Sequence, residues 1–135
     1  MSKTLNVADH LLALGRKHQE LGRVYDAVNA FERLANFQEL PAEVAEEIQV
    51  RLAELALRRR KFLRARRHLT TALVHQPDNS HYHHLMATAA DSGAKADPER
   101  AAKHFQLSLE LDPNQPTCLS EYGLLALKLR RMTKP

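Results

Sequence analysis

The feature that most constrains the fold is a spacing pattern that returns four times along the chain. In each copy a large residue precedes a small one, and the small residues are Gly15, Ala53, Ala87 and Gly123, at intervals of 38, 34 and 36 residues. A second pattern follows each of the first three, 12 to 14 residues later. Intervals near 34 residues are typical of helix-turn-helix repeats. We therefore expect helical hairpins that stack in sequence order.

The second pattern places an alanine four residues before a large apolar residue. Its three copies are Ala27 with Phe31, Ala65 with Leu69, and Ala101 with Phe105. Residues four apart share one face of a helix. The alanine lets two helices approach closely, and the larger residue fills the space beside the next hairpin. A single hairpin cannot bury this face alone, so the hairpins must stack.

The composition agrees with helices. The chain has only 4 Gly and 6 Pro in 135 residues, and aromatic residues make up 5%. We expect one domain over residues 1–135, with repeats at about 5–40, 41–77 and 78–113. The predicted helices are 5–21, 24–37, 42–58, 61–75, 80–91, 98–111 and 116–131. Asp97 before Pro98 is a typical helix start, with a capping side chain followed by proline at the first helical position.

The paired patterns resemble the tetratricopeptide repeat (TPR) family, whose repeat reads W-x2-L-G-x2-Y, then A-x3-F and a closing proline. The matching positions are Leu14-Gly15, Ala27-x3-Phe31, Ala65-x3-Leu69, Pro77, Ala101-x3-Phe105, Pro113 and Tyr122-Gly123. The match covers nearly the whole chain, although no Trp occurs and Ala replaces Gly in the second and third repeats. The resemblance implies an all-α, right-handed TPR-type solenoid of seven helices, three hairpins plus a C-terminal helix. It also implies a non-catalytic scaffold, adaptor or chaperone-like module that binds a partner protein or peptide in a concave groove.

Helix geometry applied to the repeat selects the residues of that groove. Side chains next to the small residues, and one turn either side, are expected to face the inner surface formed by the first helices. They are Leu12, Arg16, Gln19 and Glu20; Val50, Glu54, Leu57 and Arg58; His84, Thr88, Asp91 and Ser92; and Ser120, Leu124, Leu127 and Lys128. The apolar members are expected to anchor a peptide, while the cations meet its carboxylates.

One subclass of the family grips the C-terminal carboxylate of chaperones with a clamp of Lys and Asn on successive first helices. Leu12 stands where the resemblance asks for the lysine, and Arg16 follows Gly15 where it asks for asparagine. No matching asparagine occurs around Arg51. Binding through that clamp is therefore not expected.

A basic run supports an alternative function. Residues 58–67 read RRRKFLRARR, so seven of ten are cationic in a chain with a formal net charge of +4. The predicted patch consists of Arg58, Arg59, Arg60, Lys61, Arg64, Arg66 and Arg67. Three interpretations remain open: phosphate contacts to a nucleic acid, a dock for an acidic protein, or a solvated hairpin corner. Phe62 is the single aromatic residue in the run, so stacking platforms for single strands are missing.

The C-terminal helix contains more leucines than one buried stripe needs. They are Leu119, Leu124, Leu125, Leu127 and Leu129. One interpretation is that part of this helix covers another protein or a second copy of the chain. The other is that the leucines pack inside or lie singly exposed, as leucines often do.

Other functions find little support in the sequence. It has no nucleophile elbow, phosphate-binding loop, HExxH, dinucleotide fingerprint or CxxC, so no enzyme is predicted. Only His81 and His84 of the histidine cluster share a helix face, and a structural zinc needs four ligands, so no metal or other cofactor is expected. A single cysteine, Cys118, expected to be packed, and the lack of a signal peptide or a long apolar run favour a soluble, cytoplasmic protein without membrane contact.

Overall fold

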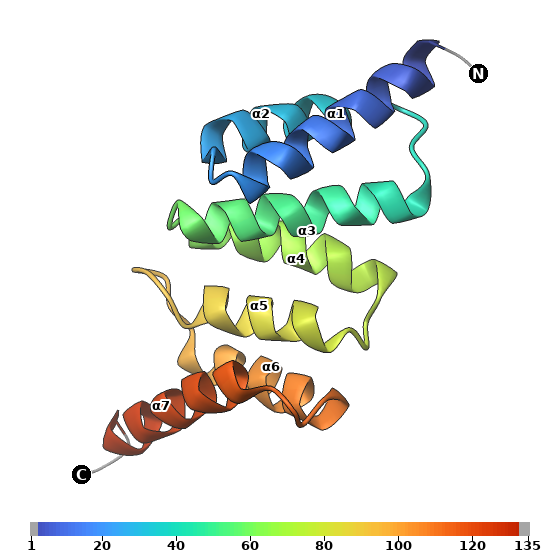
Figure 1. Ribbon diagram of the computed structural model, residues 1–135. Coiled ribbons are helices and arrows are strands. Elements are labelled where there is room, and N and C mark those ends of the chain that lie inside the picture. Colours follow the sequence, from blue (N-terminus) through green and yellow to red (C-terminus); the bar gives the residue numbers. More distant parts are fainter. Residues whose placement is uncertain (1–2, 133–135) are drawn as a thin grey trace.

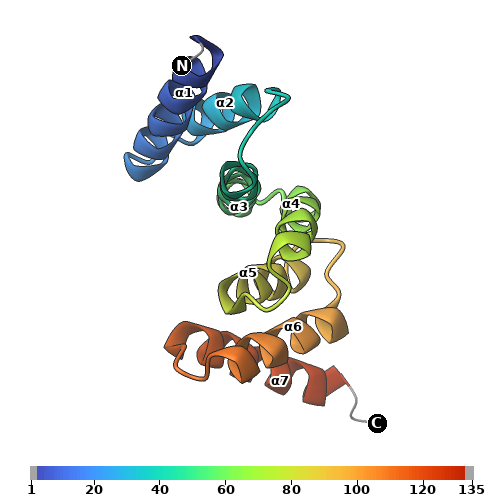
Figure 2. The ribbon, with the colours of Figure 1, turned by 90° about the vertical axis from the view of Figure 1, so that its right-hand side faces the viewer.

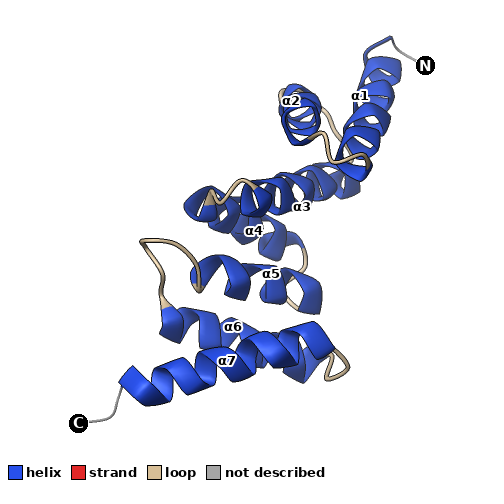
Figure 3. Cartoon of the chain, turned by 60° about the vertical axis from the view of Figure 1, so that its left-hand side comes forward, coloured by secondary structure: helices blue, strands red, loops and turns tan. Residues whose placement is uncertain are grey.

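The computed structural model describes residues 3–132, and over this range the chain forms seven α-helices and no strand (Figure 3). They are α1 (Lys3–Glu20), α2 (Val24–Ala35), α3 (Ala42–Arg58), α4 (Phe62–His75), α5 (Ser80–Ala90), α6 (Pro98–Leu111) and α7 (Pro116–Met132). Every predicted helix is confirmed, with ends that differ by two residues at most. Residues 1–2 and 133–135 of the expected domain lie outside the described residues. None of the described helices combines the length and the apolar character needed to cross a membrane.

The helices form three hairpins, α1–α2, α3–α4 and α5–α6, stacked in chain order with α7 at the end (Figure 1). Each hairpin contacts the next mainly through its second helix, so α2 packs on α3, α4 on α5, and α6 on α7. The two chain termini lie at opposite ends of the stack (Figure 2). This is the all-α hairpin solenoid that the repeat pattern predicts.

The buried apolar residues form three clusters, each shared by three consecutive helices. The first joins α1, α2 and α3 around Phe31. The second joins α3, α4 and α5 and consists mostly of alanines beside Leu69 and Met86. The third joins α5, α6 and α7 around Phe105 and Leu125. No hairpin therefore buries its apolar face without a neighbour, as expected for a stacked repeat.

The small residues of the first pattern have two different environments. Gly15 is buried, and a Cβ atom built on it would lie 2.7 Å from Cε1 of Phe31 in α2. Gly123 was expected to face a neighbouring helix in the same way, and this prediction is wrong. Gly123 is exposed and its Cβ would meet no described atom within 4 Å, because no second helix follows α7 among the described residues.

Candidate functional site

The first helices α1, α3, α5 and α7 are joined by polar side chains, beginning with a pair between α1 and α3. Arg16 donates from Nε to Oε2 of Glu47 over 2.7 Å and from Nη2 to Oε1 over 2.5 Å. Two parallel bonds of this kind fix a carboxylate better than a single contact does. Arg51 adds a third bond, from Nε to Glu47 Oε2 at 3.2 Å. The hydrogen bonds from Arg16 hold the pKa of Glu47 below its usual range.

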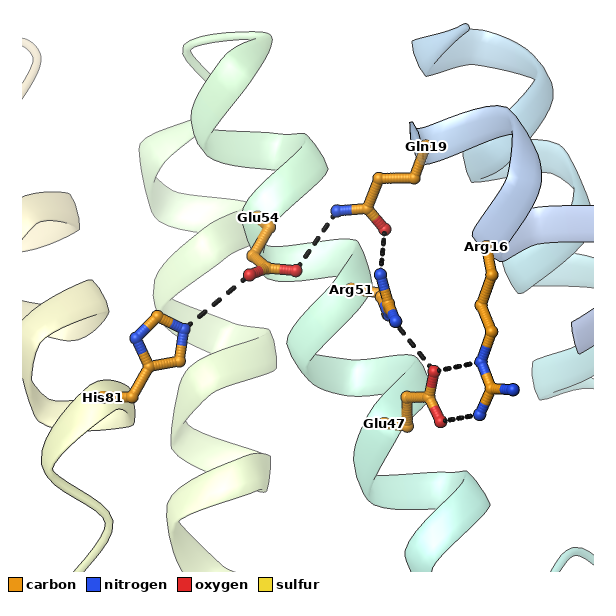
Figure 4. A network of polar contacts seen from close by, with 6 residues as sticks. All are labelled: Arg16, Gln19, Glu47, Arg51, Glu54 and His81. Atoms are coloured by element: carbon orange, nitrogen blue, oxygen red, sulfur yellow. Dashed lines mark hydrogen bonds and ion pairs between the residues drawn. The ribbon is translucent and has the colours of Figure 1, made fainter. Parts of the chain in front are cut away.

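The same contacts continue from α1 across α3 to α5 (Figure 4). Gln19 accepts a bond from Arg51 Nη1 at 3.3 Å and donates one to Glu54 Oε1 at 3.2 Å. The other oxygen of Glu54 lies 3.7 Å from His81 Nε2. Burial raises the pKa of Glu54, but the contacts with His81 and Gln19 outweigh it, so the pKa is lowered overall.

Between α5 and α7 the contacts converge on Glu121. One carboxylate oxygen of Glu121 lies 2.8 Å from His84 Nε2 and accepts a hydrogen bond from Thr88 Oγ1 at 3.1 Å. One turn on, Lys128 Nζ lies 4.0 Å from Asp91 Oδ1. We call the whole set the polar ladder: Arg16, Gln19, Glu47, Arg51, Glu54, His81, His84, Thr88, Asp91, Glu121 and Lys128. It extends over all four first helices.

The predicted groove residues fall into distinct groups. Seven belong to the polar ladder: Arg16, Gln19, Glu54, His84, Thr88, Asp91 and Lys128. Val50 and Leu57 are half-buried, whereas Glu20, Arg58, Ser120, Leu124 and Leu127 are exposed, and Ser92 donates to the Thr88 carbonyl. The prediction missed Glu47, Arg51, His81 and Glu121. The spacing of Glu47 and Arg51, four residues apart with opposite charge, is a signal that could have identified that pair.

Leu12 is a correction to the predicted groove. It is buried in the first apolar cluster together with Ala8 and Leu11. The reason is that Ala8, Leu11 and Leu12 follow the spacing of three and four residues that forms one apolar stripe on a helix, and this stripe of α1 lies in the cluster.

The leucines of α7 are divided between the core and the surface. Leu125 is buried and Leu129 packs against the third cluster. Leu119 remains exposed, as do Leu124 and Leu127, with 70% and 52% of their surface accessible. Together with Lys128, Arg131 and Met132, these last two line a surface cavity of about 340 Å³.

The basic run is mostly exposed, but Arg66 is a correction. Its guanidinium donates to the carbonyls of Ala89 at 3.3 Å, Ala90 at 2.9 Å and Lys95 at 2.9 Å, so it closes the C-terminal end of α5. A cation is favourable there because the last carbonyls of a helix carry partial negative charge. The other six cations, Arg58, Arg59, Arg60, Lys61, Arg64 and Arg67, have no carboxylate within ion-pair distance among the described residues.

Two cations of the run lie on aromatic rings. The Arg59 guanidinium lies 4.9 Å from the centre of the Tyr25 ring, and that of Arg60 lies 5.3 Å from the centre of the Phe62 ring. Arg60 also occupies the left-handed backbone region, with φ 60°. It closes α3 through bonds from its own amide to Leu57 and from the Lys61 amide to Ala56.

Within residues 3–132 no three His, Cys, Asp or Glu side chains lie so that they could hold a metal ion together. His83 is buried, with Nδ1 3.0 Å from His104 Nδ1 and Nε2 2.6 Å from the Pro77 carbonyl oxygen. Cys118 is buried as well, and burial raises the pKa of its thiol, which disfavours the reactive thiolate.

Known structures of several proteins are similar to this one. The C-terminal TPR-containing domain of an FK506-binding protein from Plasmodium falciparum matches with a TM-score of 0.83 and 16% identity, over 98% of this chain and 95% of that chain. The first TPR domain of RPAP3, bound to an HSP90 peptide, matches with a TM-score of 0.79 and 19% identity, over 93% of this chain and 94% of that chain. The second TPR domain of human RPAP3, in complex with an HSP70 peptide, matches with a TM-score of 0.74 and 17% identity, over 91% of this chain and 98% of that chain.

No protein-family model matches the sequence, and a search of curated proteins finds no match. The structural likeness, together with the stacked hairpins, defines the class of fold. The chain is a TPR-type α-solenoid.

Proposed function

We propose that this chain is a non-catalytic protein–protein interaction module that holds a segment of a partner protein on the surface of its first helices. The observation that carries the proposal is that exposed leucines and ordered charged side chains occur together on this surface. Leu124 and Leu127 remain largely exposed beside a cavity, and the fixed charges of the polar ladder extend from them towards α1. Apolar anchors beside ordered polar groups are the usual composition of a peptide-binding surface.

The similar structures support peptide binding as a use of this fold, since the two RPAP3 domains hold peptides of HSP90 and HSP70. The residues of this chain favour a different ligand. Leu12 is buried, and the guanidinium groups of Arg16 and Arg51 are already bound to Glu47. We therefore assign to this surface an internal segment with apolar side chains, bound in the cytoplasm by a scaffold or adaptor, in place of a free C-terminal carboxylate.

Paired serine substitutions test this function. Leu124→Ser with Leu127→Ser removes the apolar anchors, and we expect recovery of the partner from a lysate of the source cells to fall at least about tenfold, equivalent to about 1.4 kcal/mol. Val74→Ser is the matched control, because Val74 is 77% exposed on the second helix α4. Far-UV circular dichroism checks that all variants remain helical.

Full recovery by the folded double variant would place the partner elsewhere on the molecule. Sedimentation of the wild-type chain adds a separate result. A concentration-dependent dimer that the double variant cannot form would assign the two leucines to self-association.

A further inference from the structure

A second cavity lies where the basic run meets the loop between α5 and α6. It has a volume of about 340 Å³, and we call it the edge pocket. Its lining residues are Lys61, Phe62, Leu63, Arg64, Arg66, Arg67, Ser92, Gly93, Ala94 and Lys95. Figure 1 places the α3–α4 turn and the α5–α6 loop on the same edge of the stack.

The wall of the edge pocket is fixed by contacts within the chain. Arg66 ties the Lys95 carbonyl to the end of α5, and the Asp97 amide donates to the Ala90 carbonyl at 2.7 Å. Gly93 has a φ of 83° and approaches Phe62 so closely that a Cβ atom would lie 2.7 Å from Cδ2 of the ring. The loop is therefore held on Phe62 before any ligand binds, and preorganisation lowers the entropic cost of binding.

The charge of the edge pocket is positive on every side. Lys61, Arg64, Arg67 and Lys95 surround it, and no carboxylate lines it. Acidic groups line two cavities that share residues with it. Glu32 shares one with Arg64 and Arg67, while Asp97 and Glu99 share another with Lys95, and none of them reaches ion-pair distance. An anion would therefore meet cations that have no carboxylate partner among the described residues.

The floor of the edge pocket is apolar. Phe62 is half-buried, and Leu63 and Ala94 are exposed within the ring of cations. A nucleic-acid base finds no stacking surface here, because the Phe62 ring carries the Arg60 guanidinium 5.3 Å from its centre and is approached by Gly93. An aliphatic side chain, in contrast, can cover Leu63 and Ala94 while neighbouring carboxylates reach Lys61, Arg64 and Lys95.

We infer that the edge pocket binds a short acidic peptide segment in which an aliphatic residue is flanked by aspartates and glutamates. The edge pocket shares no lining residue with the cavity beside Leu124 and Leu127, so the inference does not depend on the function proposed above. The pocket is expected to contact the aliphatic side chain of the peptide as well as its carboxylates. A surface that binds any polyanion would need only the carboxylates.

Fluorescence anisotropy with a labelled peptide, Asp-Glu-Asp-Leu-Leu-Glu-Asp-Glu, tests the inference. Lys61→Ser, Arg64→Ser and Lys95→Ser together should weaken its binding at least about tenfold. The control carries Arg33→Ser, Arg100→Ser and Lys103→Ser, which remove the same charge from exposed positions outside the pocket, and should bind within about twofold of wild type. Ala94→Trp fills the pocket without a change of charge and should weaken binding by a similar factor.

Three further measurements decide between sources of the signal. A peptide with Ser-Ser in place of Leu-Leu should bind at least about fivefold more weakly. The variant with Leu124→Ser and Leu127→Ser should bind the acidic peptide as wild type does. Absence of saturable binding to the wild-type chain, or equal binding by the folded triple variant, would overturn the inference. A ten-nucleotide oligouridine that binds as tightly through the same three cations would replace it with nucleic-acid binding.

Discussion

At the scale of single residues, the same repeat position has opposite requirements at the two ends of the chain. Gly15 lies under the ring of Phe31, which is completely buried and cannot move aside. Gly123 occupies the equivalent place in α7 and is open to solvent. The position needs a small residue only where a second helix lies against it.

This difference predicts opposite effects of one substitution. Gly15→Ala should lower the free energy of unfolding by about 1–3 kcal/mol. The added methyl group clashes with the Phe31 ring, and the cost of this clash exceeds the free energy gained from the higher helix propensity of alanine. Gly123→Ala should raise it by about 0.5–1 kcal/mol, since only the propensity changes. Urea unfolding followed by circular dichroism measures both. A destabilised Gly123→Ala would contradict the open environment found in α7.

At the scale of elements, Arg66 connects α4 to the end of α5 and to the loop that follows. Arg66→Met keeps most of the aliphatic stem but removes the donors to Ala89, Ala90 and Lys95. We expect a loss of about 1–3 kcal/mol, the cost of leaving such carbonyls without a partner, and faster amide hydrogen exchange in residues 91–97. Arg67→Met is the matched control at the exposed neighbouring position, with little expected effect. Equal rates of amide hydrogen exchange in Arg66→Met and Arg67→Met would show that Arg66 does not hold the α5–α6 loop in place.

At the scale of the whole molecule, stability depends on pH because several half-buried groups have shifted pKa values. Burial, with His83 and Arg100 adding to it, lowers the pKa of His104 to about 4. The fold therefore favours the neutral ring, and this contribution is complete above about pH 6.5 and is lost as the pH falls towards 4. The lowered pKa values of Glu47 and Glu54 act in the same direction, but only below about pH 4.5.

Urea unfolding at pH 7 and pH 5 covers the range in which the half-buried histidines His68 and His104, whose pKa values are both lowered by burial, begin to take up protons. We expect the free energy of unfolding to fall by about 1 kcal/mol, a value reduced to allow for the half-exposed ring. His104→Gln should reduce this fall, whereas His10→Gln, at an exposed position of α1, should leave it unchanged. An identical pH dependence in wild type and His104→Gln would show that His104 does not carry the effect.

Helices and stacking order could be predicted from the sequence because their signals are local. The alanines with their partners four positions later, and Gly15 with Phe31, mark positions where helices touch, whereas Gly123 has the same pattern without a second helix against it among the described residues. The groove itself stays a prediction: several of its residues belong to the polar ladder, Leu12 is buried, and Glu47 and Arg51 were not among the predicted residues. Which partner Arg16 selects depends on the distance between α1 and α3, and that distance is set by the packing of α2.

Arg66 shows why part of the basic run could not be interpreted from its sequence. It belongs to a charge run and has the same local pattern as its exposed neighbours. Its partner Lys95 is 29 residues away, on a loop whose path depends on Gly93 and Phe62. A contact of this kind has no periodic signal. The hairpin geometry, and not the charge pattern, decides which cation is used to hold the fold.

The two sides of the stack are held by different kinds of contact, and this gives the molecule a direction of easy bending. Along the second helices, dense apolar packing resists any separation of the hairpins. Along the first helices, long polar side chains of the polar ladder bridge the gap, and their attraction declines gradually with distance and with added salt. A pulling force therefore separates the first helices of neighbouring hairpins more easily than it separates the surfaces packed through the second helices. A partner bound across several first helices, as proposed above, would therefore restrict this bending.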